Sequence, residues 1–496
     1  MAESQRSRTG DRTGDRAGDR AGVRGGRLAG VGSARLTPAE RAGRGKAART
    51  RAPRDSHAAA DLKAGRADPV ALLQRQAESR VPDLVPVRYG RMLVSPFTFF
   101  RGAALPMASD LARTPVSGLM VQACGDAHLS NFGIFGSAER RLMFDINDFD
   151  ETLPAPWEWD VKRLAASLEV AAREQGLSAK QRRAVILATV GRYRAAMRAF
   201  AAASNLQVFY ARVDIEQIRA ELGSRLTSRQ RKALDKGEAK ARTADSMRDL
   251  KKLTRVVAGE RRIVADPPLV VPLDDLLANA DRADIKAQLT SLITRYRRTL
   301  QPDRRLLLEQ YEITDVARKV VGVGSVGTLC WIVLLLGRDH RDPLFLQVKE
   351  AQPSVLAPYA GASKIANEGQ RVVAGQRLMQ AAGDAFLGWN SIGSGLDGKP
   401  RNFYVRQLRD WKFSVDIDML MPAGLQLYGE MCGWTLARAH ARSGDRIAIA
   451  AYLGGSDVFD QAIAEFAIAY ADQNELDHQA LADAAASGRI TAIHDV

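Results

Sequence analysis

The stretch GDAHLSN (residues 125–131), followed by FDINDFD (residues 144–150), decides which fold this sequence predicts. An apolar run over residues 119–123 precedes the first stretch, and residues 141–149 form a second run with strand character. Two short strands therefore flank a polar loop. The loop and the end of the second strand carry carboxylates and an amide, whose oxygen atoms are the ligands that Mg²⁺ prefers.

Asp126 and Asn131 share this loop, and Asp148 comes later, at the end of the second run. Phosphoryl transfer needs a carboxylate to accept the proton of an attacking hydroxyl, and oxygen ligands for the magnesium ion that bridges the phosphates. The spacing predicts Asp126 as the base, and Asn131 and Asp148 as metal ligands. For an isolated pair of such residues, a polar turn that caps backbone groups is the commoner interpretation.

Three nearby residues need to be assigned a role. For His128 a metal-ligand role is disfavoured, because no second histidine lies at metal-ligand spacing. Asp145 is either a second acid near the metal or a structural residue of the strand. Asp160 begins a helix predicted over residues 160–174, where an aspartate is usually a cap.

A second motif, GVGSVG, lies at residues 322–327. A lone GxGxxG is typical of a dinucleotide-binding turn, but that turn requires a helix after the last glycine. Here TLCWIVL follows, which predicts a strand, so Gly322, Gly324, Ser325 and Gly327 are placed at the tip of a hairpin. Such a hairpin lets backbone N–H groups cover phosphates, although a plain tight turn remains the alternative.

The next predicted strand, LFLQVK, follows the glycine motif and ends at Lys349. Most strand lysines are solvated edge residues, but this strand resembles the kinase strand V-A-I-K, and by that resemblance Lys349 is expected to bind phosphates. Glu368, near the start of a helix predicted over residues 364–382, is a candidate ion-pair partner for Lys349. Glu350 and Gln370 compete for that role.

These motifs resemble those of known kinases. GDxHxxN followed by I-x-D-F-D resembles the aminoglycoside and choline kinase family, LFLQVK resembles the kinase strand whose lysine holds the α- and β-phosphates, and LARAHA (residues 436–441) resembles the helix before the catalytic loop. By this resemblance His128 is expected to pack under the catalytic loop, and an acid at the position of Asp160 also ties that loop. Residues 69–490 resemble the bacterial family known as domain of unknown function 2252, through strings such as SPFTFFRGAA (95–104) and WEWDVKRLAAS (157–167). The resemblance implies a kinase-superfamily fold without naming a substrate.

The order of the motifs differs from that in kinases, where the glycine loop and lysine precede the catalytic loop. Here they lie within 322–349 and follow the loop at 125–131. The sequence therefore predicts an α+β, two-lobed protein kinase-like fold that is circularly permuted. Its expected parts are a disordered basic tail (1–66), the start of the helical catalytic lobe (67–174), a helical insert (175–300), a β-rich nucleotide-binding lobe (301–412) and C-terminal helices that complete the catalytic lobe (413–496).

Composition narrows the class of protein. The net charge is +15, but residues 1–66 hold 16 Lys/Arg and 7 Asp/Glu, so most of the excess belongs to the tail. Binding of nucleic acid is therefore expected only as a weak interaction with that tail. The three cysteines form no CxxC pair, which argues against disulfides and structural zinc. No apolar run approaches the ~20 residues that cross a membrane, and no signal peptide is visible, so a cytoplasmic location is expected.

The function expected from these features is ATP- and Mg²⁺-dependent phosphoryl transfer to the hydroxyl of a small molecule or protein. AMP transfer and non-catalytic nucleotide binding remain alternatives. Residues 88–111 and the helical insert are expected to line the acceptor pocket, but the sequence predicts neither the acceptor nor the oligomeric state.

Overall fold

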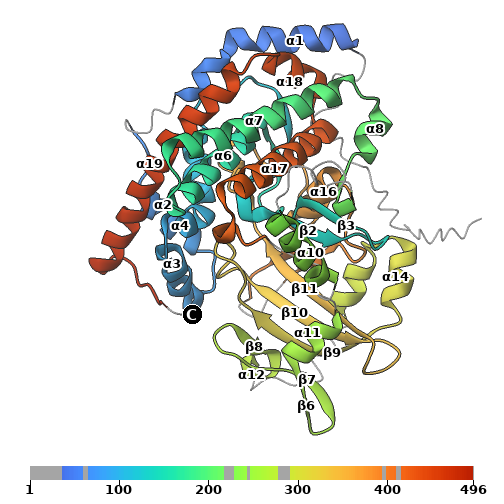
Figure 1. Cartoon of the computed structure of the whole chain (residues 1–496). Coiled ribbons are helices and arrows are strands. Elements are labelled where there is room, and N and C mark those ends of the chain that lie inside the picture. Colours follow the sequence, from blue (N-terminus) through green and yellow to red (C-terminus); the bar gives the residue numbers. More distant parts are fainter. Residues whose placement is uncertain are drawn as a thin grey trace, which may run out of the picture.

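The computed structural model describes residues 36–59, 65–216, 228–242, 246–277, 291–393, 398–408, 411 and 415–494. Helices gather in the upper part of the molecule and the largest sheet lies below them (Figure 1). The α+β class predicted from the sequence is therefore confirmed. Within the described residues, no helix combines the length and apolarity that crossing a membrane requires.

The helices have these bounds: α1 (Pro38–Arg51), α2 (Pro69–Ala77), α3 (Val85–Leu93), α4 (Pro96–Gly102), α5 (Ala104–Leu111), α6 (Trp157–Glu174), α7 (Ala179–Ala202), α8 (Asn205–Tyr210), α10 (Ser228–Arg242), α11 (Ser246–Leu253), α12 (Leu273–Leu276), α14 (Pro302–Leu308), α15 (Ala357–Ala360), α16 (Glu368–Met379), α17 (Pro422–Ser443), α18 (Arg446–Leu453) and α19 (Val458–Ala486). The helices predicted over 160–174 and 364–382 correspond to α6 and α16. Because α6 begins at Trp157, Asp160 lies in its first turn and does not cap it.

The strands have these bounds: β1 (Met120–Ala123), β2 (Phe132–Gly136), β3 (Leu142–Ile146), β4 (Leu153–Pro156), β5 (Val213–Asp214), β6 (Thr254–Val257), β7 (Glu260–Ile263), β8 (Val270–Pro272), β9 (Glu312–Lys319), β10 (Cys330–Leu336), β11 (Pro343–Ala351), β12 (Gly388–Ile392) and β13 (Arg401–Gln407). They form a six-stranded sheet in the order β12-β13-β11-β10-β9-β8, a three-stranded sheet β2-β3-β5, and the pairs β1-β4 and β6-β7. The two strands predicted to flank the polar loop are β1 and β3.

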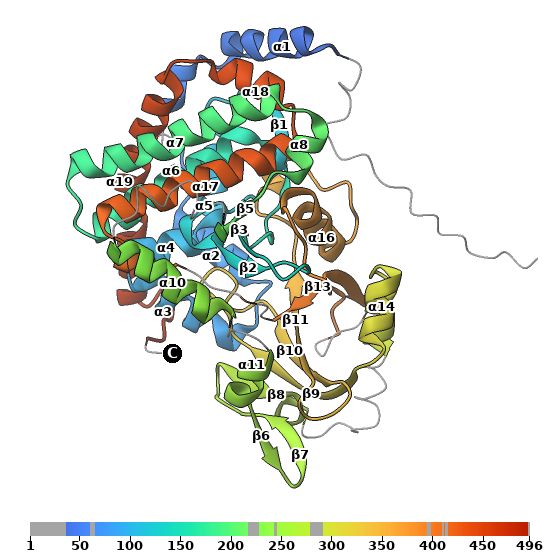
Figure 2. The ribbon, with the colours of Figure 1, turned by 45° about the vertical axis from the view of Figure 1, so that its right-hand side comes forward.

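Alternation along β11 gives the large sheet two apolar faces. Leu344 and Leu346 belong to one buried cluster, and Phe345 belongs to another. Because side chains alternate along a strand, Lys349 lies on the same face as Phe345. The helix α16 contacts β11, β12 and β13, and Figure 2 shows it between this sheet and the helical part of the molecule.

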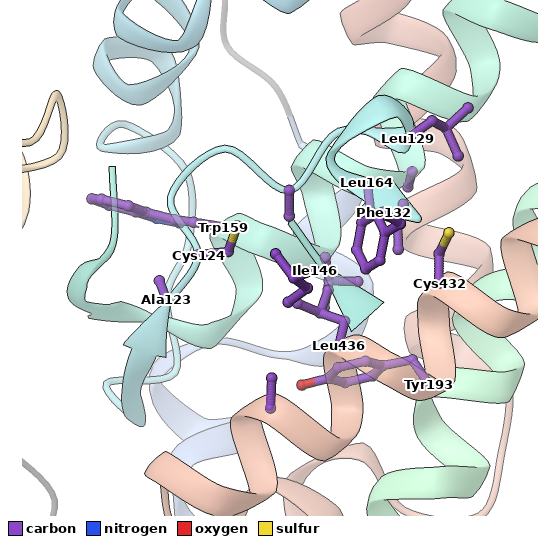
Figure 3. Close-up of a cluster of buried hydrophobic side chains, with 14 of the residues drawn as sticks. Ala123, Cys124, Leu129, Phe132, Ile146, Trp159, Leu164, Tyr193, Cys432 and Leu436 are labelled. Carbon is purple, nitrogen blue, oxygen red and sulfur yellow. The ribbon is translucent and has the colours of Figure 1, made fainter. Parts of the chain in front are cut away.

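The main core lies beneath the polar loop and holds it in place. Leu129 and Phe132, from the loop and β2, pack with Ile146 of β3, Leu164 of α6 and Leu436 of α17 (Figure 3). All five side chains are buried. The C-terminal helix α17 therefore packs against the polar loop, although the two lie far apart in the sequence.

The N-terminal segment differs from its prediction, which placed residues 1–66 in a disordered tail. Residues 1–35 lie outside the described part of the chain, but α1 is a capped helix that packs on α18. Composition missed this helix because its contacts are polar. Arg49 donates to the carbonyl oxygens of Tyr452 and Ala451, at 2.9 and 2.6 Å. These bonds provide partners for carbonyl groups in the last turn of α18 that have none within the helix.

The close approach of α1 and α18 depends on Gly45. A Cβ atom at this position would lie 2.0 Å from the carbonyl oxygen of Ala448, whereas Gly43 has nothing within 4 Å of its Cβ position. We expect Gly45→Ala to release α1 and raise amide hydrogen exchange over residues 38–51. Gly43→Ala is the matched control and should keep or increase protection, because alanine favours helix. Equal protection in the two variants would contradict this packing.

The segment predicted as a helical insert, residues 175–300, also contains strands. The hairpin β6-β7 projects from the molecule, and β8 pairs with β9 as an edge of the large sheet (Figure 1). The strand β8 falls within the run PPLVVPL (residues 267–273), whose prolines are uncommon in strands. Val270 and Val271 nevertheless favour a strand, and Pro272 is tolerated because β8 is an edge strand.

Candidate functional site

A cavity of about 1210 Å³ collects residues from both motifs. Asp126, Asn131 and Asp148 line it, together with Gly324 and Ser325 of the connection between β9 and β10. The predicted base, the predicted metal ligands and part of the glycine motif thus face one space, although they come from distant parts of the sequence.

Asp126 is fixed by an arginine that the sequence did not single out. The Nε of Arg163, on α6, donates to Oδ1 of Asp126 at 2.9 Å, and Nη2 of the same guanidinium lies 2.8 Å from that oxygen in an ion pair. The Arg163 guanidinium also lies over the ring of Phe100, with Cζ 4.0 Å from the centroid. Burial raises the pKa of Asp126 above its usual value, and Arg163 opposes this rise. The other oxygen, Oδ2, lies 3.7 Å from Nε2 of His128.

Asn131 is oriented by the backbone of the same loop. Its Nδ2 donates to the carbonyl oxygen of Asp126 at 2.6 Å. An asparagine amide has one donor end and one acceptor end, so this bond commits the donor end to the loop. The acceptor Oδ1 is then the end suited to a cation.

Lys349 reaches the carboxylates that follow β3. Its Nζ lies 2.5 Å from Oδ2 of Asp150 and 3.6 Å from Oδ2 of Asp148. The lysine side chain is 2% exposed, so it lies behind these carboxylates and does not itself line the cavity. Burial alone would lower the pKa of Lys349, but Asp148 and Asp150 outweigh it and raise the pKa well above the usual value. The lysine is therefore charged.

Asp150 and Tyr404 complete this group, and neither was predicted. Tyr404 of β13 donates its hydroxyl to Oδ1 of Asp150 at 2.6 Å, and its ring lies 5.7 Å from the ammonium of Lys349. Ser325 of the glycine motif is 3.5 Å from Oδ2 of Asp150. The repeated aspartate in the DFD motif was the sequence signal for Asp150, whereas nothing local marked Tyr404.

The glycine motif occupies the connection between two antiparallel neighbours, as the hairpin prediction required. Gly322 and Gly327 have φ values of +68° and +90°, which glycine adopts without strain. The motif is docked on the helical part of the molecule: Val81 N–H donates to the oxygen of Gly327 at 2.8 Å, and Arg91 donates to the oxygen of Gly322 at 2.7 Å. Gly322 and Gly327 therefore shape the turn without lining the cavity.

The structure pairs Lys349 with none of the three partners considered from the sequence. Glu368 lines the cavity but forms an ion pair with Arg371 one turn along α16. Glu350 accepts from the backbone N–H of Leu329 at 3.0 Å and pairs with Arg401. Gln370 lies in the first turn of α16, where its N–H is capped by Asn367. Sequence order suggested a helix partner because it could not show that the DFD turn passes directly beneath β11.

The three supporting residues are all buried. His128 accepts from the N–H of Ser130 through Nδ1 at 3.2 Å, and burial lowers its pKa well below the usual value. Asp160 accepts from the N–H groups of Cys124 and Gly125 at 2.7 and 2.9 Å, so it ties the start of the polar loop. His440 of the LARAHA segment approaches the same carboxylate at 3.0 Å.

Asp145 lies in the core, away from the cavity. It contacts Arg438 at 2.5 Å and accepts from the N–H of Ala381 at 2.9 Å, and its side chain is 1% exposed. Of its two predicted roles, this geometry fits the structural one.

The cavity also contains Glu151, which was not predicted. Burial raises the pKa of Glu151 to about 7, against a smaller opposing effect of the bond from Val355 N–H. Among the residues that the structure describes, no group of three or more His, Cys, Asp or Glu side chains is arranged to hold a metal ion. Mg²⁺ sites at nucleotides commonly use only one or two carboxylates, with phosphates and water as the other ligands, so Asn131 and Asp148 fit that pattern.

The chain was compared with known proteins. No curated protein and no solved structure gives a significant match. The family DUF2252, described as an uncharacterized protein conserved in bacteria, matches residues 80–484. The matched region contains the polar loop, the DFD turn, the glycine motif and Lys349. Because the match covers well over half of the sequence, the chain belongs to the bacterial family DUF2252.

Proposed function

We propose that this protein is an ATP- and Mg²⁺-dependent phosphotransferase with a two-lobed, circularly permuted kinase-like fold, acting on a hydroxyl group. The observation that carries the proposal is the meeting of two distant motifs. Asp126, Asn131 and Asp148 line one cavity with Gly324 and Ser325 of the glycine motif, and Lys349 lies 3.6 Å from Asp148. Phosphoryl transfer depends mainly on such positioning and on charge.

In this proposal Asp126 is the base. Its Oδ1 is occupied by Arg163, which leaves Oδ2 to accept the proton of the acceptor hydroxyl. The raised pKa of Asp126 suits that task, because a stronger base takes the proton more readily. His128, buried and neutral, supports the loop behind the carboxylate.

Asn131 and Asp148 would hold the magnesium ion. The Asp148 side chain is 30% exposed, and the donor end of the Asn131 amide is bound to the loop, so both can present oxygens to the cavity. The bound ion would neutralise charge on the nucleotide phosphates. Lys349 keeps Asp148 and Asp150 in place and adds a positive charge beneath them.

Several contacts support the permuted order. In a kinase the helix before the catalytic loop packs beside that loop, and here Tyr428 of α17 donates to the carbonyl oxygens of Leu129 and Phe132, at the end of the polar loop. His440 of α17 and the N–H groups of Cys124 and Gly125 share the Asp160 carboxylate. A permutation preserves such contacts because it changes only where the chain begins and ends.

The test is to identify the products formed from ATP. Full-length protein is incubated with Mg-ATP, and nucleotides are separated by chromatography. Release of ADP supports phosphoryl transfer, including slow transfer to water. Release of pyrophosphate would instead indicate AMP transfer, and an unchanged nucleotide pool despite binding would indicate a non-catalytic module. Either of the last two results overturns the proposal.

A further inference from the structure

Three arginines from the segment before the polar loop form a cluster in the wall of the cavity. Arg80 precedes α3, Arg88 lies on α3 and Arg101 lies on α4. Arg80 and Arg101 line the cavity. Arg88 lies behind them: its Nη2 donates to Oε1 of Gln76 at 2.7 Å and to the oxygen of Gly102 at 3.0 Å, and both of those residues line the cavity.

This arginine cluster has unsatisfied donors. The Nε atoms of Arg80, Arg88 and Arg101, and Nη1 of Arg88, are buried without a hydrogen-bond partner. Within the described part of the chain, none of the three forms an ion pair with a carboxylate. Arg80 is 8% exposed and Arg88 is fully buried. Buried charges in proteins are normally paired, so an unpaired group of this kind requires an explanation.

The acids around the cluster are already engaged. Asp126 and Asp418 attract Arg101 only at longer range, and Glu151, Glu350 and Asp150 attract Arg80 in the same way. Each of these acids that lines the cavity has a nearer partner. Asp126 pairs with Arg163, and Glu151 accepts from the N–H of Val355. Glu350 pairs with Arg401, and Asp150 pairs with Lys349. Burial lowers the pKa of Arg80 to about 10, so it stays charged at neutral pH. The cluster thus carries positive charge that the surrounding carboxylates do not pair.

The cluster adjoins both parts of the proposed active site. Arg80 donates through Nη1 to the carbonyl oxygen of Val326 in the glycine motif. The backbone oxygen of Arg101 lies 3.2 Å from the position that a Cβ atom on Gly324 would take. Asp126 also acts electrostatically on Arg101, and both residues line the cavity. A group bound by these arginines would therefore lie between the glycine motif and the proposed base.

We propose that Arg80 and Arg101, backed by Arg88, form an anion-binding site for a phosphate group. A guanidinium matches phosphate through two parallel N–H···O bonds. Arg80 and Arg101 both line the cavity, and no carboxylate of the described residues pairs with either of them, so a bound phosphate would balance their charge. The inference rests on the proposed function and deepens it, because it assigns phosphate recognition to residues other than Lys349. The phosphate belongs either to the nucleotide or to an acceptor that is itself phosphorylated.

The experiment measures binding of inorganic phosphate to the full-length protein by calorimetry. Arg101→Gln is expected to weaken binding about tenfold or more, because it removes a charged, bidentate donor. Arg101→Lys should recover part of the affinity. The matched control is Arg338→Gln, which removes an arginine whose side chain is 81% exposed and should leave binding unchanged. No phosphate binding by the wild type, or equal affinity in Arg101→Gln and the control, overturns the site.

A second set of titrations distinguishes the two sources of phosphate. Phosphate that still binds with Mg-ADP present, and is lost only in Arg101→Gln, indicates a phosphorylated acceptor. Phosphate that is displaced by Mg-ATP, together with weaker Mg-ATP binding in Arg101→Gln, assigns the arginines to the nucleotide. Both results support the anion site. A protein that binds phosphate but not ATP would reject the proposed function and leave this inference standing.

Discussion

Replacing Asp126 with asparagine is expected to lower ATP turnover about 10²–10⁴-fold while leaving Mg-ATP affinity close to that of the wild type. Asparagine has nearly the same shape and can still accept a hydrogen bond from Arg163, but it does not take up a proton at neutral pH. Only the step that needs the base should therefore be lost. Steady-state turnover and calorimetric affinity, measured on the same preparation, check this.

Asp148→Asn provides the comparison, because the same chemical change is made at the proposed metal ligand. There the Mg²⁺-dependent part of ATP binding should fall together with turnover, since the carboxylate proposed to hold the ion is gone. Unchanged turnover in Asp126→Asn would remove Asp126 from the mechanism. Equal losses of affinity in the two variants would mean that Asp126 serves binding and not proton transfer.

The second large effect is expected on stability, at Asp145. Asp145→Ala leaves Arg438 as a buried charge without its partner and also removes the acceptor for the N–H groups of Ile146 and Ala381. Breaking a buried ion pair in this way costs about 3–5 kcal/mol. The free energy of unfolding, measured by urea denaturation, should fall by that amount.

The control for this prediction is Asp339→Ala. Asp339 pairs with Arg338 at the surface, with side-chain exposures of 37% and 81%, and exposed pairs of this kind contribute little to stability. A fall in stability at Asp145→Ala no larger than at Asp339→Ala would show that the Asp145–Arg438 pair does not stabilise the core. In that case the alternative role of Asp145, near a metal, would need to be reconsidered.

Local patterns predicted the elements that carry the site. The apolar runs around residues 119–123 and 141–149 correspond to β1 and β3, and the strand predicted to end at Lys349 corresponds to β11. Strands of this kind can be predicted because the alternation of apolar side chains and the preference of β-branched residues for strands are local properties of the sequence. The meeting of Lys349 with Asp148 was predicted from the resemblance to kinases. Periodicity alone contains no information about contacts between segments so far apart in the sequence.

The partners within the site depend on such distant contacts and were missed. Arg163 was part of a quoted motif, yet only the packing of α6 beside the polar loop shows that it binds Asp126. Tyr404 reaches Asp150 because β13 is the neighbour of β11 in the sheet, an order that the sequence does not state. The expectation for the acceptor pocket named residues 88–111, of which Arg101 and Leu105 line the cavity, and the helical insert, none of whose described residues lines it. It did not identify the unpaired charge there.

Whether the two distant segments form one nucleotide site can be decided by calorimetric titration of the full-length protein with ATP. We expect one ATP bound per chain when Mg²⁺ is present, much weaker binding in EDTA, and loss of the Mg²⁺-dependent affinity in both Asp148→Asn and Lys349→Met. If the wild-type protein binds no ATP, or if neither EDTA nor either substitution changes the binding, the two segments do not form such a site.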